Sequence, residues 1–338
     1  MTIDRIPPMA APTGTDFVFF IHGVNTRLGP NNPGYARNLI SLLIEANDHP
    51  RLTLSLHELE WYTIMQEAEQ QLLQWLNESP HWRRSWFRDF RRTQIIPFTG
   101  DAALYISRYI GSEVVKLLKE QAVEILRHSN PETDRLHLVA HSWGSVILFD
   151  IFFAGRWDNP DIPGYEDAQF IRRAIFGLEP ESQQGIRVAS IHTLGSPVAL
   201  ANLINLKRMT AHPGTKLNEK SIRTVFTHDI TFGLEQLLHM LYDRHSKPLT
   251  WRNFAHVGDP VAYPLATIIP KLISVEESGK HYLDIEDVST RGTGFLEIIA
   301  SLLRRSFLAL VNGGNAHQSY WRNRRVAQMI VQMIRKSA

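Results

Sequence analysis

The stretch that most constrains the fold is residues 138–150, which read LVAHSWGSVILFD. Three apolar residues that favour strands are followed at once by the turn His-Ser-Trp-Gly and then by a second apolar run. The first run suits a buried strand, and the second suits the start of a buried helix. A strand that passes directly into a helix is typical of α/β folds, and Ser142 lies at the point of the turn.

The same alternation continues along the rest of the chain. Short apolar runs predict strands at residues 16–23, 51–61, 135–140, 186–195, 249–257 and 281–288. Helical periodicity lies between them, near 35–47 and over most of 62–127. Strands that are joined through helices are too far apart for hairpins. The sequence therefore predicts an α/β fold with a mostly parallel central sheet and helices on both faces.

Composition excludes several classes of function. The 338 residues are 43% hydrophobic, enough for a substantial core, and 36 Lys and Arg against 34 Asp and Glu give a formal charge of +2. Such a balance does not favour nucleic acid as the main partner. Without cysteine there is no disulfide and no thiol nucleophile. The 15 histidines lack the H-E-x-x-H spacing, so we expect no metal and no cofactor.

The first residues do not resemble a targeting segment. Residues 1–13 contain Asp4 and three prolines where a signal peptide needs a continuous apolar run, so we expect a disordered arm there. The longest apolar runs elsewhere fall well below the roughly 18 residues that span a bilayer. We therefore expect one domain over residues 14–338, and a cytoplasmic location.

Ser142 has the surroundings of a nucleophile elbow. This is a tight strand-to-helix turn that tolerates only small neighbours and exposes a hydroxyl above the sheet edge. The sequence is Ala140-His141-Ser142-Trp143-Gly144, with alanine in place of the first glycine of the usual G-x-S-x-G. A serine hydroxyl needs a base to take its proton, so a histidine and an orienting carboxylate should follow in the order Ser, Asp or Glu, His.

Later segments supply candidates for both groups. Asp259 lies in a Gly-Asp-Pro turn just past the predicted strand 249–257, and His317 lies in the glycine-rich loop NGGNAHQSYW that leads into the last helix. Asp259 could also be a simple turn former, since Asp-Pro commonly opens a loop. The remaining rivals are Asp229 for the acid, and His256 and His281 for the base.

With these motifs, the chain resembles an α/β-hydrolase-fold serine hydrolase of the lipase and esterase type. HSWGSVILFD, GDPV and AHQSYW each resemble motifs of lipase-like families, including the class 3 lipases. The resemblance implies that Ser142 is the nucleophile, His317 the general base and Asp259 its orienting acid. It also implies that Val24 and Trp143 contribute the backbone N–H groups of an oxyanion hole.

The implied function is hydrolysis of carboxylic esters, with a small-molecule ester or a lipid as substrate. Thioester or amide cleavage uses the same groups and is not distinguished by the sequence. The alternative is a catalytically silent protein of the same fold that binds a hydrophobic ligand or a partner protein. The presence of all three candidate residues argues against that alternative.

Two insertions are expected to form helical caps, at about 62–100 and 203–248. Within the first, residues 81–92 (HWRRSWFRDFRR) would form one helix that aligns Trp82, Trp86 and Phe90 and spreads five arginines over the remaining surface. A cap over the active-site cleft is the favoured interpretation of this helix. A peripheral membrane contact is the second, and nucleic acid is not expected.

Overall fold

The computed structural model describes most of the chain. The described residues are 14–24, 26, 34–49, 52–92, 96, 100–176, 185–201, 229–273, 281–290 and 316–337. The arm expected at 1–13 and the first part of the insertion expected at 203–248 lie outside them.

The centre of the fold is a seven-stranded sheet in which every pair of neighbouring strands is parallel. The order is β2-β1-β3-β5-β6-β7, and the short β4 pairs with β5. The strands are β1 Thr15–Ile21, β2 Thr53–Leu59, β3 Arg135–His141, β4 Ile175–Phe176, β5 Ile186–Leu194, β6 Leu249–His256 and β7 Leu283–Thr290. All six strands predicted from the sequence are confirmed.

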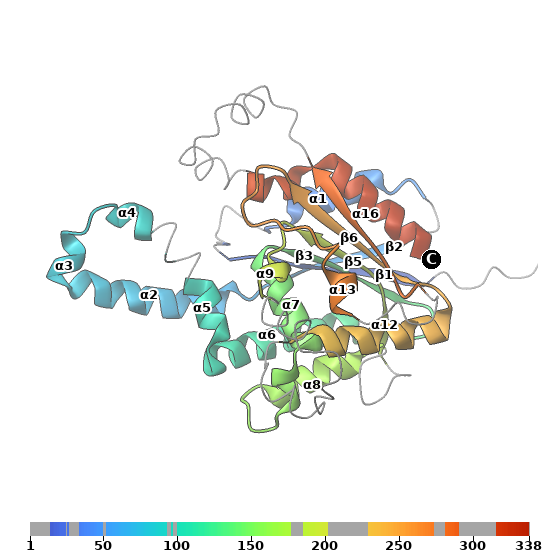
Figure 1. Cartoon of the computed structure of the whole chain (residues 1–338), viewed down its shortest axis with the longest axis horizontal. Helices are drawn as coiled ribbons and strands as arrows, with labels where there is room; N and C mark the ends of the chain where they lie inside the picture. The colour runs from blue at the N-terminus through green and yellow to red at the C-terminus, as the bar shows by residue number, and fades with distance from the viewer. Residues whose placement is uncertain are drawn as a thin grey trace, which may run out of the picture.

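Helices cover both faces of this sheet, as Figure 1 shows. One face carries α1 Arg37–Ala46 and α16 Arg324–Ser337; the other carries α6 Arg108–Leu126, α7 Trp143–Phe153, α8 Tyr165–Ala174 and α12 Thr231–His245. The alternation along β1 decides which side chain faces which layer. Phe17, Phe19 and Ile21 point to the larger core, and Val18 and Phe20 point to the core under α1 and α16. The predicted α/β fold class is confirmed.

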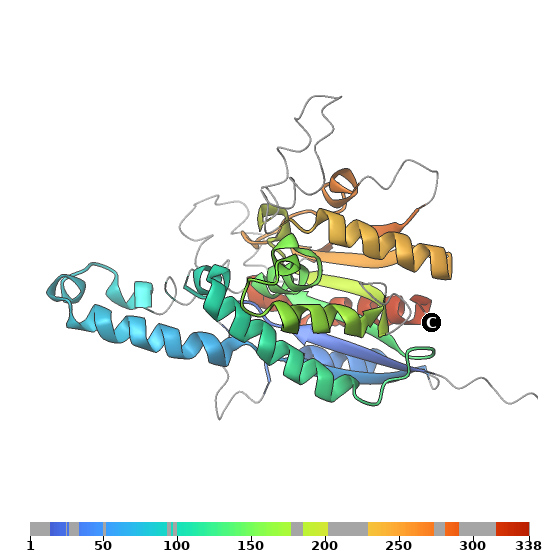
Figure 2. The same ribbon diagram turned by 90° about the horizontal axis from the view of Figure 1, so that it is seen from below.

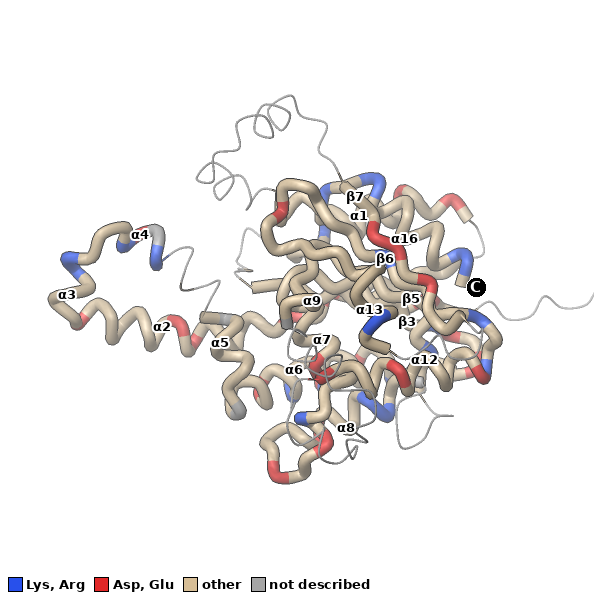
Figure 3. The backbone as a smooth tube through the Cα atoms, viewed as in Figure 1, with Lys and Arg blue, Asp and Glu red and all other residues tan. Residues whose placement is uncertain are grey.

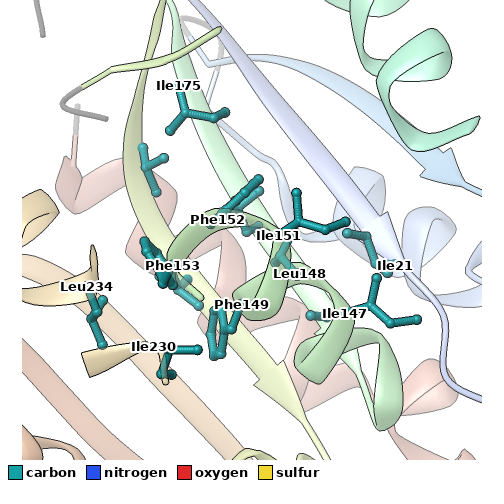
Figure 4. Close-up of a cluster of buried hydrophobic side chains, with 14 of the residues drawn as sticks. Ile21, Ile147, Leu148, Phe149, Ile151, Phe152, Phe153, Ile175, Ile230 and Leu234 are labelled. Atoms are coloured by element: carbon teal, nitrogen blue, oxygen red, sulfur yellow. The ribbon is translucent and has the colours of Figure 1, made fainter. Parts of the chain in front are cut away.

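Helix α7 lies at the centre of the larger core. Nine of its residues are buried, so it is packed on all sides rather than along one stripe. Figure 4 shows its side chains Leu148, Ile151 and Phe152 among residues of β1 and β4, with Ile230 and Leu234 near Phe149 and Phe153. This packing fixes the start of α7, and therefore the position of Ser142.

The described parts of the two expected cap insertions take different positions relative to the sheet. From β2 the chain continues into α2 Tyr62–Glu78, which leads away from the sheet, as Figure 2 shows. By contrast, α12 packs with Leu234, Leu237 and Leu238 in the core beside α7, so this part of the second insertion belongs to the helix layer of the sheet. The extent of any cap remains a prediction. No helix in the described residues is both long and apolar enough to cross a membrane.

The expectation of one helix over residues 81–92 is wrong. Two short helices, α3 Pro80–Arg83 and α4 Arg88–Phe90, are separated by a break at Phe87, whose φ of 56° is left-handed. The end of α3 is wound more tightly than an α-helix, because the N–H groups of Arg84 and Ser85 donate to carbonyls three residues earlier in the chain. Trp82 is buried and Trp86 is exposed, so the aromatic residues do not form the single stripe that a continuous helix would produce.

Candidate active site

Ser142 lies between β3 and α7 in a strained backbone conformation. Its φ of 53° and ψ of −131° are rarely adopted by a residue with a side chain. The Ser142 N–H donates to the Leu194 carbonyl at 2.9 Å, which ties the turn to the end of β5. Strain of this kind persists only where surrounding structure enforces it, and it is common at functional sites.

Two glycines allow the loop after β1 to press against this turn. A methyl group on Gly144 would lie 2.3 Å from the His22 carbonyl oxygen, and one on Gly23 would lie 2.4 Å from Ser142 Cβ. Neither position can hold a larger residue without movement of the backbone. Ala140, which replaces the first glycine of the usual motif, is fully buried in the core.

The structure brings together the three residues that the sequence singled out as nucleophile, base and acid. His317 Nε2 lies 2.7 Å from Ser142 Oγ, and His317 Nδ1 lies 2.9 Å from Asp259 Oδ2. In the chain, His317 is 175 positions from Ser142 and 58 positions from Asp259. Because a neutral imidazole carries one proton, this arrangement lets Nδ1–H donate to the carboxylate while Nε2 accepts from the serine hydroxyl.

Asp259 is held by several donors. In addition to His317, the Tyr320 hydroxyl donates to Oδ2 at 2.8 Å and the Val261 N–H donates to Oδ1 at 2.9 Å. Burial on its own would raise the pKa of Asp259, but the hydrogen bonds from His317, Val261 and Tyr320 and the charge of His317 outweigh it and lower the pKa. The side chain is therefore a carboxylate at neutral pH.

His141 supports the loop that carries His317. Its Nε2–H donates to the His317 carbonyl oxygen at 2.7 Å, and the two ring centroids are 4.6 Å apart. Complete burial, followed by repulsion from His317, lowers the pKa of His141 to about 3. A neutral His141 donates one hydrogen bond and adds no positive charge beside the His317 ring.

Sequence reasoning missed two residues of this site, Gly195 and Tyr320. Gly195 follows β5 with a φ of 58°, and a methyl group there would lie 2.6 Å from Asp259 Oδ2 and 3.1 Å from His317 Nδ1. The Tyr320 hydroxyl also accepts the His256 N–H at 2.7 Å. The available signals were a glycine at the end of the predicted strand 186–195 and a tyrosine three residues after His317.

Val24 and Trp143, expected to supply oxyanion donors, flank the Ser142 turn. Trp143 is the first residue of α7, and Val24 follows Gly23, which touches Ser142. Within the described residues, neither backbone N–H donates a hydrogen bond to the protein.

His22 and Trp61 hold the loop that carries Val24. His22 Nδ1–H donates to the Gly23 carbonyl oxygen at 2.8 Å, and His22 Nε2 accepts the Trp61 N–H at 3.2 Å. The two rings stack with centroids 4.8 Å apart, and Trp61 Nε1–H donates to the His22 carbonyl oxygen at 2.9 Å. These contacts connect the loop after β1 to the end of β2.

The rival acid and bases have other surroundings. Asp229 precedes α12, where its Oδ1 accepts the Thr231 N–H at 2.7 Å. His256 Nδ1 accepts the Gly258 N–H at 3.0 Å. His281 precedes β7 and so lies at the amino edge of the parallel sheet, opposite the carboxyl edge that carries Ser142.

A second Ser-His-Asp arrangement is formed by buried side chains on the neighbouring strands β1, β3 and β5. His137 Nδ1 is 2.7 Å from Ser190 Oγ, and His137 Nε2 is 2.9 Å from Asp16 Oδ1. All three residues are fully buried, and Arg135 forms two further hydrogen bonds to Asp16. Without access for a substrate, this set is structural. Among the described residues, no cluster of three or more His, Asp or Glu side chains could hold a metal ion.

Comparisons with known proteins give a few distant similarities. No family model matches the chain. A probable mitochondrial phospholipase of Saccharomyces cerevisiae is 26% identical over 175 residues, which cover 51% of this chain and 19% of the length of the yeast protein.

Several solved structures are similar at 9–15% identity. Dienelactone hydrolase from Anabaena variabilis covers 87% of this chain and 86% of its own, with 11% identity and a TM-score of 0.33. Esterase B from Lactobacillus rhamnosis covers 98% of this chain and 79% of its own, with 11% identity and a TM-score of 0.37. The parallel sheet, the turn at Ser142 and the chain order Ser, Asp, His are themselves those of an α/β-hydrolase fold.

Proposed function

We propose that this protein is a serine hydrolase that cleaves carboxylic esters through an acyl-enzyme on Ser142. One observation carries the proposal: a continuous chain of hydrogen bonds runs from Ser142 Oγ through both ring nitrogens of His317 to Asp259 Oδ2. The strained turn supports it, because nothing in a simple strand-to-helix connection requires a serine with a positive φ.

The first step is attack of Ser142 Oγ on the ester carbonyl carbon. As the new C–O bond forms, the hydroxyl proton moves to His317 Nε2 across the 2.7 Å hydrogen bond. The imidazolium that results is stabilised by the Asp259 carboxylate, whose lowered pKa keeps it ionised. Asp259 also fixes the tautomer that leaves Nε2 free to accept the proton.

The carbonyl oxygen becomes negatively charged in this step. The backbone N–H groups of Val24 and Trp143 are the proposed donors to it, because they flank Ser142 and have no other acceptor within the described residues. Loss of one such donor typically lowers turnover by about 10² to 10³. Trp143 also begins α7, so the positive end of the helix dipole faces the same oxygen.

Collapse of the tetrahedral intermediate releases the alcohol and then the acid. His317 Nε2–H gives its proton to the leaving alkoxide oxygen as the C–O bond breaks, which leaves Ser142 acylated. Water then attacks the acyl carbon while His317 accepts one of its protons. That proton returns to Ser142 Oγ as the carboxylic acid departs, and the starting state is restored.

The proposed substrate carries a hydrophobic acyl group. Apolar side chains lie exposed on segments that follow the strands around Ser142, including Leu200 after β5 at 45% and Val257 after β6 at 71% exposure. The description of the yeast relative as a probable phospholipase agrees with a lipid-like ester.

Hydrolysis of a graded series of p-nitrophenyl esters, from acetate to palmitate, tests the proposal. We expect turnover by the wild type, and a fall in kcat/KM of at least about 10⁴ for Ser142→Ala. The chain length that gives the highest kcat/KM reports the size of the acyl site.

Ser190→Ala is a matched control, because Ser190 also contacts a histidine but is buried on β5 without access for a substrate. We expect it to retain activity while its melting temperature reports the loss of the buried hydrogen bonds. If no ester is cleaved by the folded wild type, or if Ser142→Ala retains activity, the proposal fails.

A further inference from the structure

Helices α2, α3 and α4 form an arm (residues 62–92) that extends from the body of the protein (Figures 1 and 2). The buried residues of α2 are Tyr62, Met65 and Glu69, all in its first half. From Gln70 to Glu78 no residue of α2 is buried. Leu73 and Leu76 are half-buried and the other seven residues are exposed, so this half of α2 gains little of the tertiary packing that usually stabilises a helix.

The outer part of the arm exposes large apolar side chains. Leu72 and Trp75 on α2 are exposed, and Trp86 and Phe87, in the turn between α3 and α4, are 81% and 74% exposed. Phe87 has a left-handed backbone conformation, and α4 begins at the next residue, Arg88. Several large apolar side chains exposed on one segment are typical of an interaction surface.

Positive charge surrounds the same aromatic residues. Five arginines lie in residues 83–92, at positions 83, 84, 88, 91 and 92, and all five are exposed. The only acid in that segment is Asp89, which pairs with Arg92 at 3.2 Å. Figure 3 shows blue segments at α3 and α4, where the charge of the arm is concentrated. The whole chain, in contrast, has a formal charge of only +2.

We infer that the arm binds an anionic lipid surface. Trp86 and Phe87 would enter the boundary between head groups and acyl chains, and the arginines would contact lipid phosphates. Base stacking on the same aromatic residues by a nucleic acid would leave the aliphatic Leu72 without a partner. The combination of aliphatic, aromatic and cationic groups on one arm favours the membrane.

The arm begins on the same side of the molecule as the candidate active site. Trp61 precedes α2 at the carboxyl end of β2, and it stacks on His22 next to the proposed oxyanion loop. Strands β2, β1 and β3 are parallel neighbours, so the arm and Ser142 leave the same edge of the sheet. A docked arm would therefore direct this edge toward the bilayer. That consequence rests on the proposed function, whereas lipid binding does not.

Co-sedimentation with phosphatidylcholine vesicles, with and without phosphatidylglycerol, tests the inference. We expect the wild type to sediment with the anionic vesicles and to be released by salt. Each arginine near an anionic surface strengthens binding by about fivefold, so Arg83→Gln/Arg84→Gln/Arg88→Gln should weaken binding on the order of a hundredfold. Trp86→Ala/Phe87→Ala should weaken it by at least about tenfold.

Two controls separate this inference from the proposed function. Phe170→Ala removes an exposed aromatic residue that lies beside Lys119 and Arg173 on the body of the protein, and it should leave vesicle binding unchanged. Ser142→Ala should bind vesicles like the wild type, whatever its activity. The two arm variants should hydrolyse a soluble short-chain ester at the wild-type rate.

Three results would overturn the inference. The first is a folded wild type that does not sediment with anionic vesicles. The second is binding that the two arm variants retain. The third is a wild-type dimer or a nucleic-acid complex that Trp86→Ala/Phe87→Ala disrupts while vesicle binding is absent, which would identify another occupant for the arm.

Discussion

Gly195 and Asp259 approach each other so closely that a methyl group on Gly195 would lie 2.6 Å from Asp259 Oδ2. Gly195 lies at the end of β5 with a φ of 58°, and Asp259 lies in the turn after β6. The glycine therefore leaves the space in which the carboxylate and His317 meet. This relationship makes Gly195 part of the site, although it has no side chain.

Gly195→Ala should lower both activity and stability. A displacement of about 1 Å in the Asp259–His317 pair can cost on the order of 10² in turnover, and alanine at a positive φ costs more than about 1 kcal/mol of stability. Ester hydrolysis and urea unfolding measure the two effects. The matched change Gly155→Ala, where the nearest contact is Asp158 Oδ2 at 3.8 Å, should affect neither; wild-type activity in Gly195→Ala would refute the assignment.

Tyr320→Phe should lower kcat more than it changes KM. The hydroxyl donates to Asp259 Oδ2 and accepts the His256 N–H, so its loss frees the carboxylate and leaves a buried donor unpaired. We expect a fall in kcat of about tenfold and a stability loss of about 1–3 kcal/mol. Because this hydrogen bond helps to lower the pKa of Asp259, the activity loss should increase as the pH falls.

Tyr105→Phe is the corresponding control for Tyr320. Tyr105 is also buried and donates to a carboxylate, Asp150 Oδ2, at 2.7 Å, but Asp150 lies on α7 and does not contact Ser142, His317 or Asp259 in the hydrogen bonds of the site. It should lose stability and keep the wild-type kcat. Equal kcat losses in both variants would show that the Tyr320 effect is general destabilisation.

His22→Ala should slow the chemical step without removing the nucleophile. His22 holds the Gly23 carbonyl and stacks on Trp61, so its loss frees the loop that carries the Val24 N–H. We expect kcat to fall by about 10², the typical value for one oxyanion donor. His57→Ala removes another histidine that stacks on an aromatic ring, at Phe17, and should retain kcat. Unchanged kcat in His22→Ala would exclude this role.

Buried histidines should make the protein less stable in acid. His141 is neutral in the folded protein because burial lowers its pKa to about 3, whereas in the unfolded chain it binds a proton near its ordinary pKa of 6.5. The unfolded state therefore holds more protons between these values, and stability falls as the pH decreases through that range. Burial likewise lowers the pKa of His137 and His192, which add to the effect.

His141→Gln measures how much His141 alone contributes to this pH dependence. Glutamine can still donate to the His317 carbonyl, but it does not titrate. The slope of unfolding free energy against pH should decrease by up to about 1.4 kcal/mol per pH unit in the acid range. Urea unfolding of both proteins at several pH values measures the slope. Identical slopes would mean that His141 binds its proton equally in the folded and unfolded states.

The sheet could be predicted because its strands are buried and separated by helices. Each predicted strand overlaps an observed one, and the end of the 135–140 run fixed the position of the turn at Ser142. Strand β4 was missed, since two residues carry no alternation to detect. The break at Phe87 was also missed, because residues 81–92 contain neither glycine nor proline to signal it.

The candidate site was only partly readable from the sequence. Ser142, Asp259 and His317 lie in local motifs, so their residue types and chain order indicated them before any contact was known. The contributions of Gly195 and Tyr320 depend on distances between the ends of β5 and β6 and the loop before α16. Such distances arise only when the parallel strands align, so a glycine at a strand end and a tyrosine after His317 could not by themselves assign these two residues to the site.

Reaction with a fluorophosphonate probe, followed by mass spectrometry of the intact protein and of its peptides, tests the central claim most directly. The account predicts one covalent adduct, located on Ser142, with no adduct on Ser142→Ala and much slower labelling of His317→Ala. A folded wild type that remains unlabelled, or an adduct located on another serine, would contradict it.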